Sequence, residues 1–167
     1  MPVTPYHFGI GAAVKAVAPN GFSLVAFVLA QLIIDLEPLY YLLTNAPPWH
    51  RFMHTFAGAT VVVVLTILFA RLFRRVLGAI WQWGSEQPFE MPNTTRLAVF
   101  LGAVTGAYSH IWVDSIMHDD VYPLAPFSQL SPIHGLTPVL ELEQYCLSLG
   151  VVGLAVLAFR FREKWSR

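Results

Sequence analysis

Four long apolar runs divide this chain and constrain its fold more than any other feature. They cover residues 22–43, 56–70, 97–113 and 138–159. About 20 apolar residues are needed for a helix to cross the ~30 Å hydrocarbon core of a bilayer. Only 12% of the 167 residues are charged, whereas soluble domains contain about 25%, so the chain has too little polar surface for a soluble globule. We therefore predict an all-α, polytopic membrane helical bundle of about four transmembrane helices, in a single integral-membrane domain over residues 1–167.

A shorter helix is predicted ahead of the first span. Residues 9–17 are mostly apolar and follow Pro5, so this helix should begin near His7. It is too short to cross a bilayer, and we expect it to lie at the interface or to re-enter the membrane. The N-terminus lacks the basic start, apolar core and cleavage site of a secretory signal, so the helices themselves would direct insertion.

The ends of the spans are predicted from proline, charge and tryptophan. Pro38 is expected to kink or end the first helix, because a proline restricts the residue before it. The second span is expected to fray at Arg71, and Trp81 and Trp83 resemble the aromatic anchors of a membrane interface. Loops are predicted at 44–49, 84–93 and 121–137.

Three further residues are expected to be structural. His134 has no helical partner in the last loop, so we expect it at the surface. Cys146 is the single cysteine, which excludes an intramolecular disulfide, and it should pack in an apolar run. Gly106 and its small neighbours should allow two helices to approach closely. The net charge is zero, so nothing points to a nucleic-acid partner.

Basic residues predict the orientation of the bundle. They gather after the second span and in the C-terminal tail, at Arg71, Arg74, Arg75, Arg96, Arg160, Arg162, Lys164 and Arg167. The loop between the first two spans carries only one basic residue, Arg51, and the loop between the last two spans carries no basic residue. Four spans with both termini in the cytoplasm fit this distribution.

Histidines and carboxylates gather at the opposite, non-cytoplasmic ends of the spans. His110, Asp114 and His118 are four residues apart at the end of the third span, so they should form one stripe on a helix. Two imidazoles and a carboxylate make part of a divalent-metal site. The alternative is a solvated helix end in which the histidines pair with neighbouring carboxylates.

The first two spans contribute to the same membrane face. Asp35 and Glu37 lie near the end of the first span, and a carboxylate inside a membrane segment marks a functional site or a paired charge. His50 and His54 precede the second span and share a face if the helix has already begun there. An interfacial belt that anchors a helix end is the alternative. Chance placement would scatter such groups over both faces, so their convergence favours a metal site.

The order and spacing of these elements also carry a family resemblance. They are Thr4-Pro5-x-His7, Asp35-x-Glu37, His50-Arg51-x-x-His54-Thr55, Ser109-His110-x-x-x-Asp114 and the proline-rich piece 123–128. Over roughly residues 1–130 the chain resembles the small integral-membrane metal-dependent hydrolases, a group that includes the LexA-regulated membrane-bound one. Phe52 stands where a glycine is frequent in that group, and Glu37 where an aspartate is usual. The resemblance implies a metal site in a bacterial inner membrane and, through similarity to zinc-dependent phospholipases and nucleases, a hydrolase.

A divalent metal is the cofactor that these ligands imply. Zn²⁺ fits a mixed histidine and aspartate set best, as one or two ions, with Mn²⁺ or Fe²⁺ as alternatives. We expect five direct ligands, with two further histidines as ligands or as groups that orient them. The direct set is His7, Asp35, His54, His110 and Asp114, and the further pair is His50 and His118.

The predicted chemistry is hydrolysis by a metal-activated water, whose pKa would fall to about 7. Arg51 would stabilise charge on phosphoryl oxygens, and Glu37 is the second candidate catalytic residue. A site near the bilayer surface favours an amphiphilic, lipid-like phosphoester or ester, with membrane lipids as partners. The alternatives are a divalent-metal-binding or transport protein, a haem protein with two facing histidines, and a purely structural membrane protein.

Overall fold

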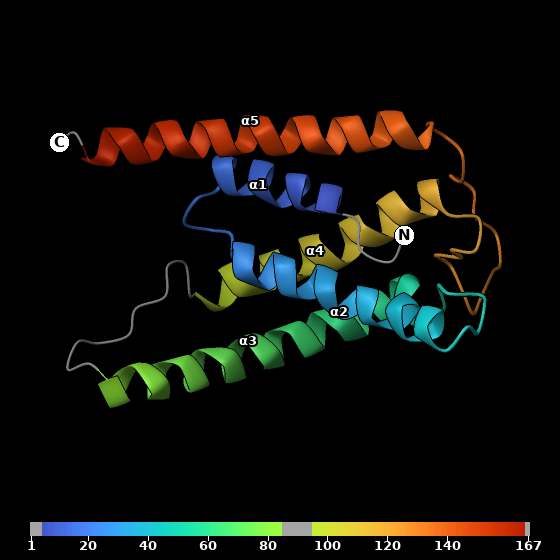
Figure 1. Cartoon of the computed structure of the whole chain (residues 1–167), viewed down its shortest axis with the longest axis horizontal. Helices are drawn as coiled ribbons and strands as arrows, with labels where there is room; N and C mark the ends of the chain where they lie inside the picture. Colours follow the sequence, from blue (N-terminus) through green and yellow to red (C-terminus); the bar gives the residue numbers. More distant parts are fainter. Residues whose placement is uncertain (1–4, 85–94, 166–167) are drawn as a thin grey trace.

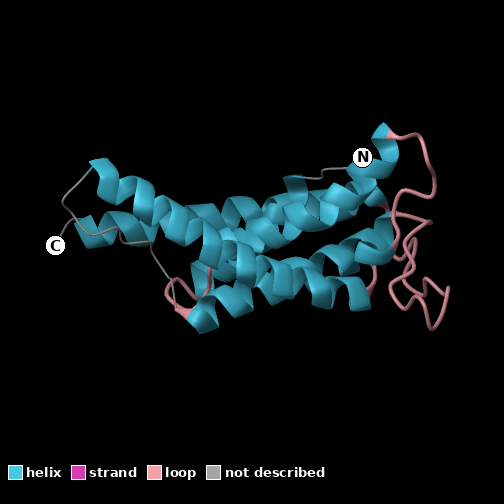
Figure 2. Ribbon diagram, turned by 90° about the horizontal axis from the view of Figure 1, so that it is seen from below, coloured by secondary structure: helices cyan, strands magenta, loops and turns pink. Residues whose placement is uncertain are grey.

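The structure, a computed structural model, describes residues 5–84 and 95–165, and within these ranges it contains helices and loops but no strand (Figures 1 and 2). The all-α prediction is confirmed. Thr4, the predicted loop from residue 85 onward and the tail residue Arg167 lie outside the described residues. The elements in chain order are η1 (Pro5–His7), α1 (Phe8–Val17), α2 (Leu24–Leu43), η2 (Phe52–His54), α3 (Phe56–Gly84), α4 (Arg96–Met117) and α5 (Val139–Trp165).

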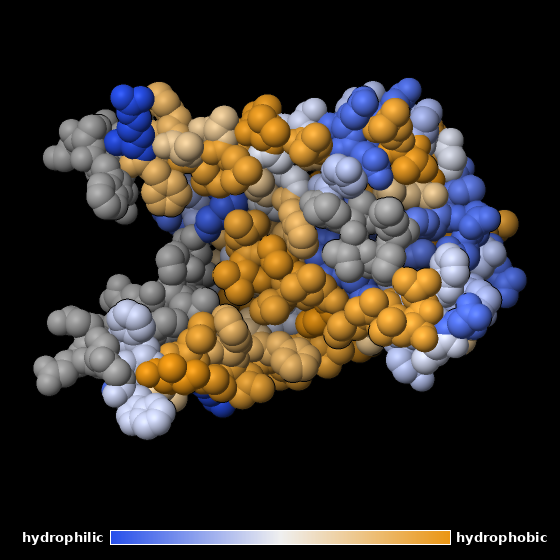
Figure 3. Space-filling model, in the orientation of Figure 1, coloured by the Kyte–Doolittle hydropathy of each residue, from blue (hydrophilic) through white to orange (hydrophobic). Residues whose placement is uncertain are grey.

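Four of these helices are long and apolar enough to cross a membrane, as predicted. The candidate spans are Leu24–Leu43, Phe56–Trp83, Arg96–Met117 and Val139–Arg162. In Figure 3, apolar residues cover the lengths of the helices, and polar residues gather at the end that the inter-helix loops form. The described part of the chain is therefore a helical membrane bundle whose loop end is polar.

Small residues bring the helices into close contact. α2 packs against α4, and α1 packs against α5 (Figure 1). A Cβ atom added at Gly106 of α4 would lie 2.6 Å from the carbonyl oxygen of Phe27 and 3.0 Å from Cβ of Ala30. A Cβ atom added at Gly9 of α1 would likewise collide with the backbone of Cys146, which is buried. The predicted roles of Gly106 and Cys146 are confirmed, because small residues permit such close approach in membranes.

An apolar core joins α2, α3 and α4 directly beside the polar end. It contains Ala30, Ile34, Ala59, Val62, Val63, Ala103, Ala107 and Ile111. Ile34 and Ile111 precede and follow the site residues Asp35 and His110 in the sequence. The core therefore supports the polar cluster and separates it from the other end of the bundle.

One helix is longer than predicted, and another runs through the proline that was expected to kink or end it. α2 continues through Pro38 to Leu43, because neighbouring helices in a membrane can satisfy the backbone groups that a proline leaves free. α3 continues past Arg71 to Gly84, so Trp81 and Trp83 lie on its last turns. Arginine is a good helix former, and charge alone does not end a helix.

α1 runs beside the long helices rather than across them (Figure 1), as expected of a re-entrant rather than an interfacial helix. Pro5–His7 lie toward the loop end of the bundle, whereas α5 finishes at the opposite end (Figure 1). The two ends of the described chain therefore differ from the expected arrangement, in which both termini share one face. The reason is that α1 adds a partial crossing before the four spans begin.

Candidate metal centre

The seven predicted metal-ligand residues come together at the loop end of the bundle. They form three overlapping groups, and in each group one possible ligand atom per residue lies within 4.8 Å of the others. The groups are His7, His110 and Asp114; Asp35, His54 and His110; and His50, Asp114 and His118. Four separate segments of the chain, around residues 7, 35, 50–54 and 110–118, thus contribute to one cluster, which only the folded bundle assembles.

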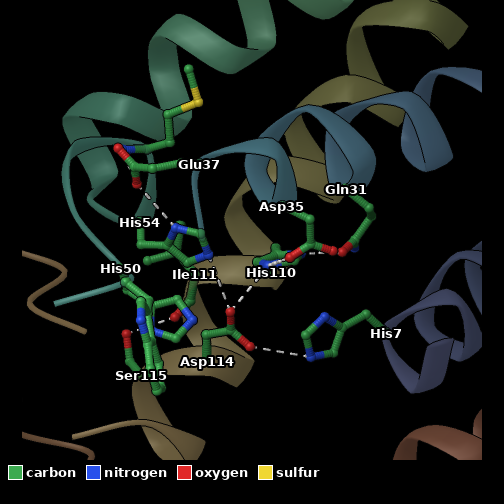
Figure 4. Close-up of polar contacts among 12 residues, drawn as sticks. His7, Gln31, Asp35, Glu37, His50, His54, His110, Ile111, Asp114 and Ser115 are labelled. Carbon is green, nitrogen blue, oxygen red and sulfur yellow. Dashed lines mark hydrogen bonds and ion pairs between the residues drawn. The ribbon is translucent and has the colours of Figure 1, made fainter. Parts of the chain in front are cut away.

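Asp114 is the centre of this cluster (Figure 4). Its Oδ1 lies 3.4 Å from Nε2 of His7, and its Oδ2 lies 3.4 Å from Nε2 of His54 and 3.0 Å from Nε2 of His110. Nε2 of His110 is also 3.4 Å from Oδ1 of Asp35. Ligand atoms bound to one ion at about 2.0–2.2 Å are spaced about 3 to 3.6 Å apart, so these separations suit a shared ion.

The facing atoms lack hydrogen bonds. Among the described residues, the buried side-chain atoms without a hydrogen-bond partner include Nε2 of His7, His54 and His110, together with Oδ1 of Asp114. Buried polar groups in folded proteins are nearly always satisfied, and leaving one unpaired costs about 1–3 kcal/mol. These four atoms face one another, so together they could hold a cation.

Three of the histidines are held by their other ring nitrogen. Nδ1 of His110 pairs with Oε1 of Gln31, Nδ1 of His54 lies 3.3 Å from Oε2 of Glu37, and Nδ1 of His50 lies 2.7 Å from Oδ1 of Asp120. Metal-binding histidines usually donate their second ring N–H to a carboxylate or carbonyl oxygen, which fixes the tautomer and the ring orientation. A neutral histidine ring that donates from Nδ1 to such an oxygen keeps Nε2 free to bind a metal.

Gln31 and Asp120 are functional candidates that the sequence analysis missed. Gln31 is buried and also donates from Nε2 to the carbonyl oxygen of Gly106 at 3.2 Å. The sequence did contain a signal for Gln31. It is a polar amide side chain within an apolar span, one helical turn before Asp35. Asp120 accepts from the backbone N–H groups of Trp49 and His50 at 3.2 and 3.3 Å. No sequence spacing links residues 50 and 120.

The side chain of Gln31 is therefore expected to set metal affinity without touching the metal. Replacing it by leucine removes the acceptor for His110, and we expect zinc affinity to fall about 10- to 100-fold, as for other groups that orient a metal ligand. Competition with a fluorescent zinc chelator measures the change. Gln144→Leu, on the exposed side of α5, is the matched control. Equal affinity in the two variants would contradict the role.

His50 and His118 reach the cluster differently from the prediction. α4 ends at Met117, and His118 has an extended backbone with φ −117° and ψ 132°, so the predicted stripe stops at Asp114. His50 precedes the turn η2 rather than lying on a helix. The two rings nevertheless stack, with centroids 4.6 Å apart and planes at 26°. The tertiary fold, not helical periodicity, pairs them.

His7 is buried and lies within the cluster, as predicted. The turn η1, which His7 ends just before α1, carries it there, next to the His110 ring at a centroid distance of 4.6 Å. Burial lowers the pKa of His7 to about 4, although the nearby carboxylate of Asp114 opposes the change. The ring is therefore neutral at pH 7, which is the form that binds a metal.

Neighbouring groups and burial shift the pKa values of three further side chains outside the spans. Burial, with His54 close by, lowers the pKa of His50. Burial also acts to lower the pKa of His54, but the carboxylates of Asp114 and Glu37 outweigh it and raise the value. Burial acts to raise the pKa of Asp120, but the hydrogen bond from His50 prevails and lowers it. The carboxylates thus create a negative environment that a divalent cation would neutralise.

Glu37 shapes the turn that presents His54. Its Oε2 accepts from the backbone N–H groups of Arg51 and Met53, each at 3.0 Å, besides its contact with His54. These contacts give Glu37 a positioning role, because they hold η2 and the His54 ring together. Its predicted catalytic role stays a prediction.

Arg51 points into its own loop in this structure. Its Nε donates to the carbonyl oxygen of Pro48 at 3.0 Å, and one terminal nitrogen donates to that of Ala46 at 2.8 Å. The guanidinium also lies 3.6 Å from the centroid of the Tyr41 ring. Arg51 is exposed and stabilises the loop that carries His50, and its predicted contact with substrate stays a prediction.

The surface residue His134 is exposed in the loop after α4, as predicted. The same loop is tied to the cluster, because the carbonyl oxygen of Pro123 accepts from the N–H of Phe56 at 2.9 Å. His134 stands apart from the three donor groups, and so it provides a natural control for histidine substitutions.

Comparison with known proteins yields one match. A family model described as a domain of unknown function, DUF4184, matches residues 1–167, the whole chain. No curated protein and no solved structure matches the chain.

Proposed function

This chain belongs to the DUF4184 family, and we propose that it is a membrane-embedded, metal-dependent hydrolase that acts on an amphiphilic phosphoester or ester. One observation carries the proposal: the Nε2 atoms of three histidines and one carboxylate oxygen, none of them hydrogen-bonded, converge at the polar end of a membrane bundle. The donor set of nitrogen and oxygen atoms suits Zn²⁺ best, with Mn²⁺ or Fe²⁺ as alternatives.

The chemistry follows from the ligand types. A divalent ion bound here would lower the pKa of a water ligand to about 7 and so supply hydroxide at neutral pH. The chain's own residues bind and orient: His7, His54, His110 and Asp114 offer ligand atoms, while Gln31 and Glu37 hold the rings. Asp35 is a further ligand or a base for the attacking water.

The exposed edge of the cluster favours an amphiphilic substrate. The side chain of Asp35 is 13% exposed, and on the same helix Leu32 and Leu36 are 43% and 59% exposed. The accessible ligand thus borders an apolar outer surface that the bilayer would cover. A lipid-like molecule can place its chains there and its polar ester at the cluster.

The site would face away from the cytoplasm. Arg71, Arg75 and Arg160 lie toward the ends of α3 and α5 that are opposite the cluster, and basic residues favour the cytoplasmic side. We propose that the protein lies in a bacterial inner membrane, with its active site at the outer surface of that membrane.

Metal transport and haem binding receive less support. A transport path needs polar groups through the bilayer, whereas the residues below the cluster form the apolar core of Ile34, Val62 and Ile111. Haem ligands face each other across a macrocycle, whereas the rings of His7 and His110 lie 4.6 Å apart. The remaining alternative is a protein that binds a metal without hydrolysing anything, and an activity measurement distinguishes it from a hydrolase.

The proposal is tested with zinc-loaded protein reconstituted in vesicles. We expect hydrolysis of a long-chain phospholipid or lipid phosphate that stops when a chelator removes the metal and returns when zinc is restored. A water-soluble nitrophenyl ester or phosphate should react more slowly, because it lacks apolar chains. The exposed-histidine variant His134→Ala should match the unaltered protein. Full zinc loading with no turnover of any of these compounds would leave a metal-binding protein and overturn the hydrolase.

A further inference from the structure

The three donor groups are not equivalent. The first two share His110, whereas the third, formed by His50, Asp114 and His118, shares Asp114 with the first group and no residue with the second. Seven side chains exceed the four ligands of a tetrahedral zinc site. The cluster therefore divides into two sets of donors that meet at one carboxylate.

The third group has its own supporting hydrogen bonds. Asp120 lies 2.7 Å from Nδ1 of His50 through Oδ1, and its Oδ2 accepts from the backbone N–H of Trp49 and His50. A carboxylate that fixes a histidine by its second nitrogen is typical of metal sites. Asp120 thus does for His50 what Gln31 does for His110. The stacked ring of His118 lies beside His50 at a centroid distance of 4.6 Å.

We propose that His50, His118 and Asp114 bind a second divalent ion, so that Asp114 bridges two metals. The inference rests on the proposed hydrolase. Each carboxylate oxygen of Asp114 has two lone pairs, and Oδ1 has no hydrogen-bond partner within the described residues. Two-metal sites stabilise both the attacking and the leaving oxygen of an in-line displacement, as in phosphatases and nucleases. Within the proposed function, a two-metal site favours a phosphoester over a carboxylic ester as the substrate class.

The experiment loads the purified full-length protein with Mn²⁺ and measures metal content and the electron paramagnetic resonance spectrum. The unaltered protein should bind two equivalents and show a spin-coupled pair of ions. His118→Ala should retain one equivalent with the signal of an isolated ion, and that retained ion reports that the variant is folded. His134→Ala, which removes an exposed histidine, should keep two coupled ions.

A milder variant guards against loss of folding. Asp120→Asn leaves all donor atoms in place but weakens the hold on His50, and we expect the affinity for the second ion alone to fall about 10- to 100-fold. One equivalent in the unaltered protein, or two coupled ions in His118→Ala, would overturn the second site. Equal affinities for both ions in Asp120→Asn and the unaltered protein would also count against it.

The two proposals fail in different ways. Protein that holds two coupled ions but hydrolyses no phosphoester or ester would overturn the hydrolase and leave the two-metal site intact. Protein that hydrolyses a phosphoester with one bound ion would overturn only the second site. Faster turnover of a carboxylic ester than of the matched phosphoester would overturn the assignment of the substrate class.

Discussion

Asp114→Asn protein should purify without stoichiometric metal and without hydrolytic activity. Asp114 is buried, belongs to two of the three donor groups and faces the Nε2 atoms of three histidines. Asparagine keeps the size of the side chain but removes its charge and one of its acceptor oxygens. We expect metal affinity to fall by more than the about 10- to 100-fold typical of residues that only orient a ligand.

Elemental analysis of the detergent-purified variant measures this loss, and turnover of a long-chain phosphoester provides a second readout. Asp119→Asn is the control, because Asp119 is an exposed aspartate five residues along the chain. It should keep its metal and its activity. A normal metal content in Asp114→Asn would show that the cluster is not the binding site.

Chelation should lower the thermal stability of the unaltered protein. Without a cation, the ring nitrogens of His7, His54 and His110 face a buried carboxylate with no hydrogen bond. A ligand present at about 1,000 times its dissociation constant adds about 4 kcal/mol to the stability of the folded state. In a chain of this size that amounts to a shift in Tm of about 10 °C.

Differential scanning fluorimetry in detergent, with and without a chelator, measures the shift. Zinc added back should restore the original Tm. Asp114→Asn should unfold at the same temperature in both conditions, which separates metal release from any direct effect of the chelator on the micelle. An unchanged Tm in the unaltered protein, with metal demonstrably removed, would show that the ion contributes little to folding.

Much of the architecture could be predicted because a bilayer leaves a chain few choices. The apolar runs predicted all four long helices, and the sparse charges indicated which ends lie in water. One error arose where a local signal was given too much weight, because Arg71 does not end α3. Pro38 was expected to kink or end the first helix, and α2 does not end there. Neighbouring helices in a membrane can satisfy the backbone groups that a proline leaves free, and an exposed arginine continues a helix at little cost.

The identity of the ligands was also accessible from sequence, since polar side chains in membrane segments are costly and must have partners. His110 and Asp114 share a helix face and could be paired by spacing alone. Spacing alone could not predict three other features. They are the approach of His7 to Asp114, the turn of His118 away from the helical stripe, and the stacking of His118 on His50. These depend on where α1 docks and where α4 ends.

The sequence by itself therefore determined which side chains leave the lipid and at which end of the bundle they gather. The tertiary structure alone decided which atoms meet. The close contact of α2 with α4 at Gly106 brings Gln31 to His110, and the loop after α4 brings Asp120 to His50. The physical reason is range: hydrophobicity and helical period act within a segment, whereas ligand geometry depends on contacts between segments far apart in the chain.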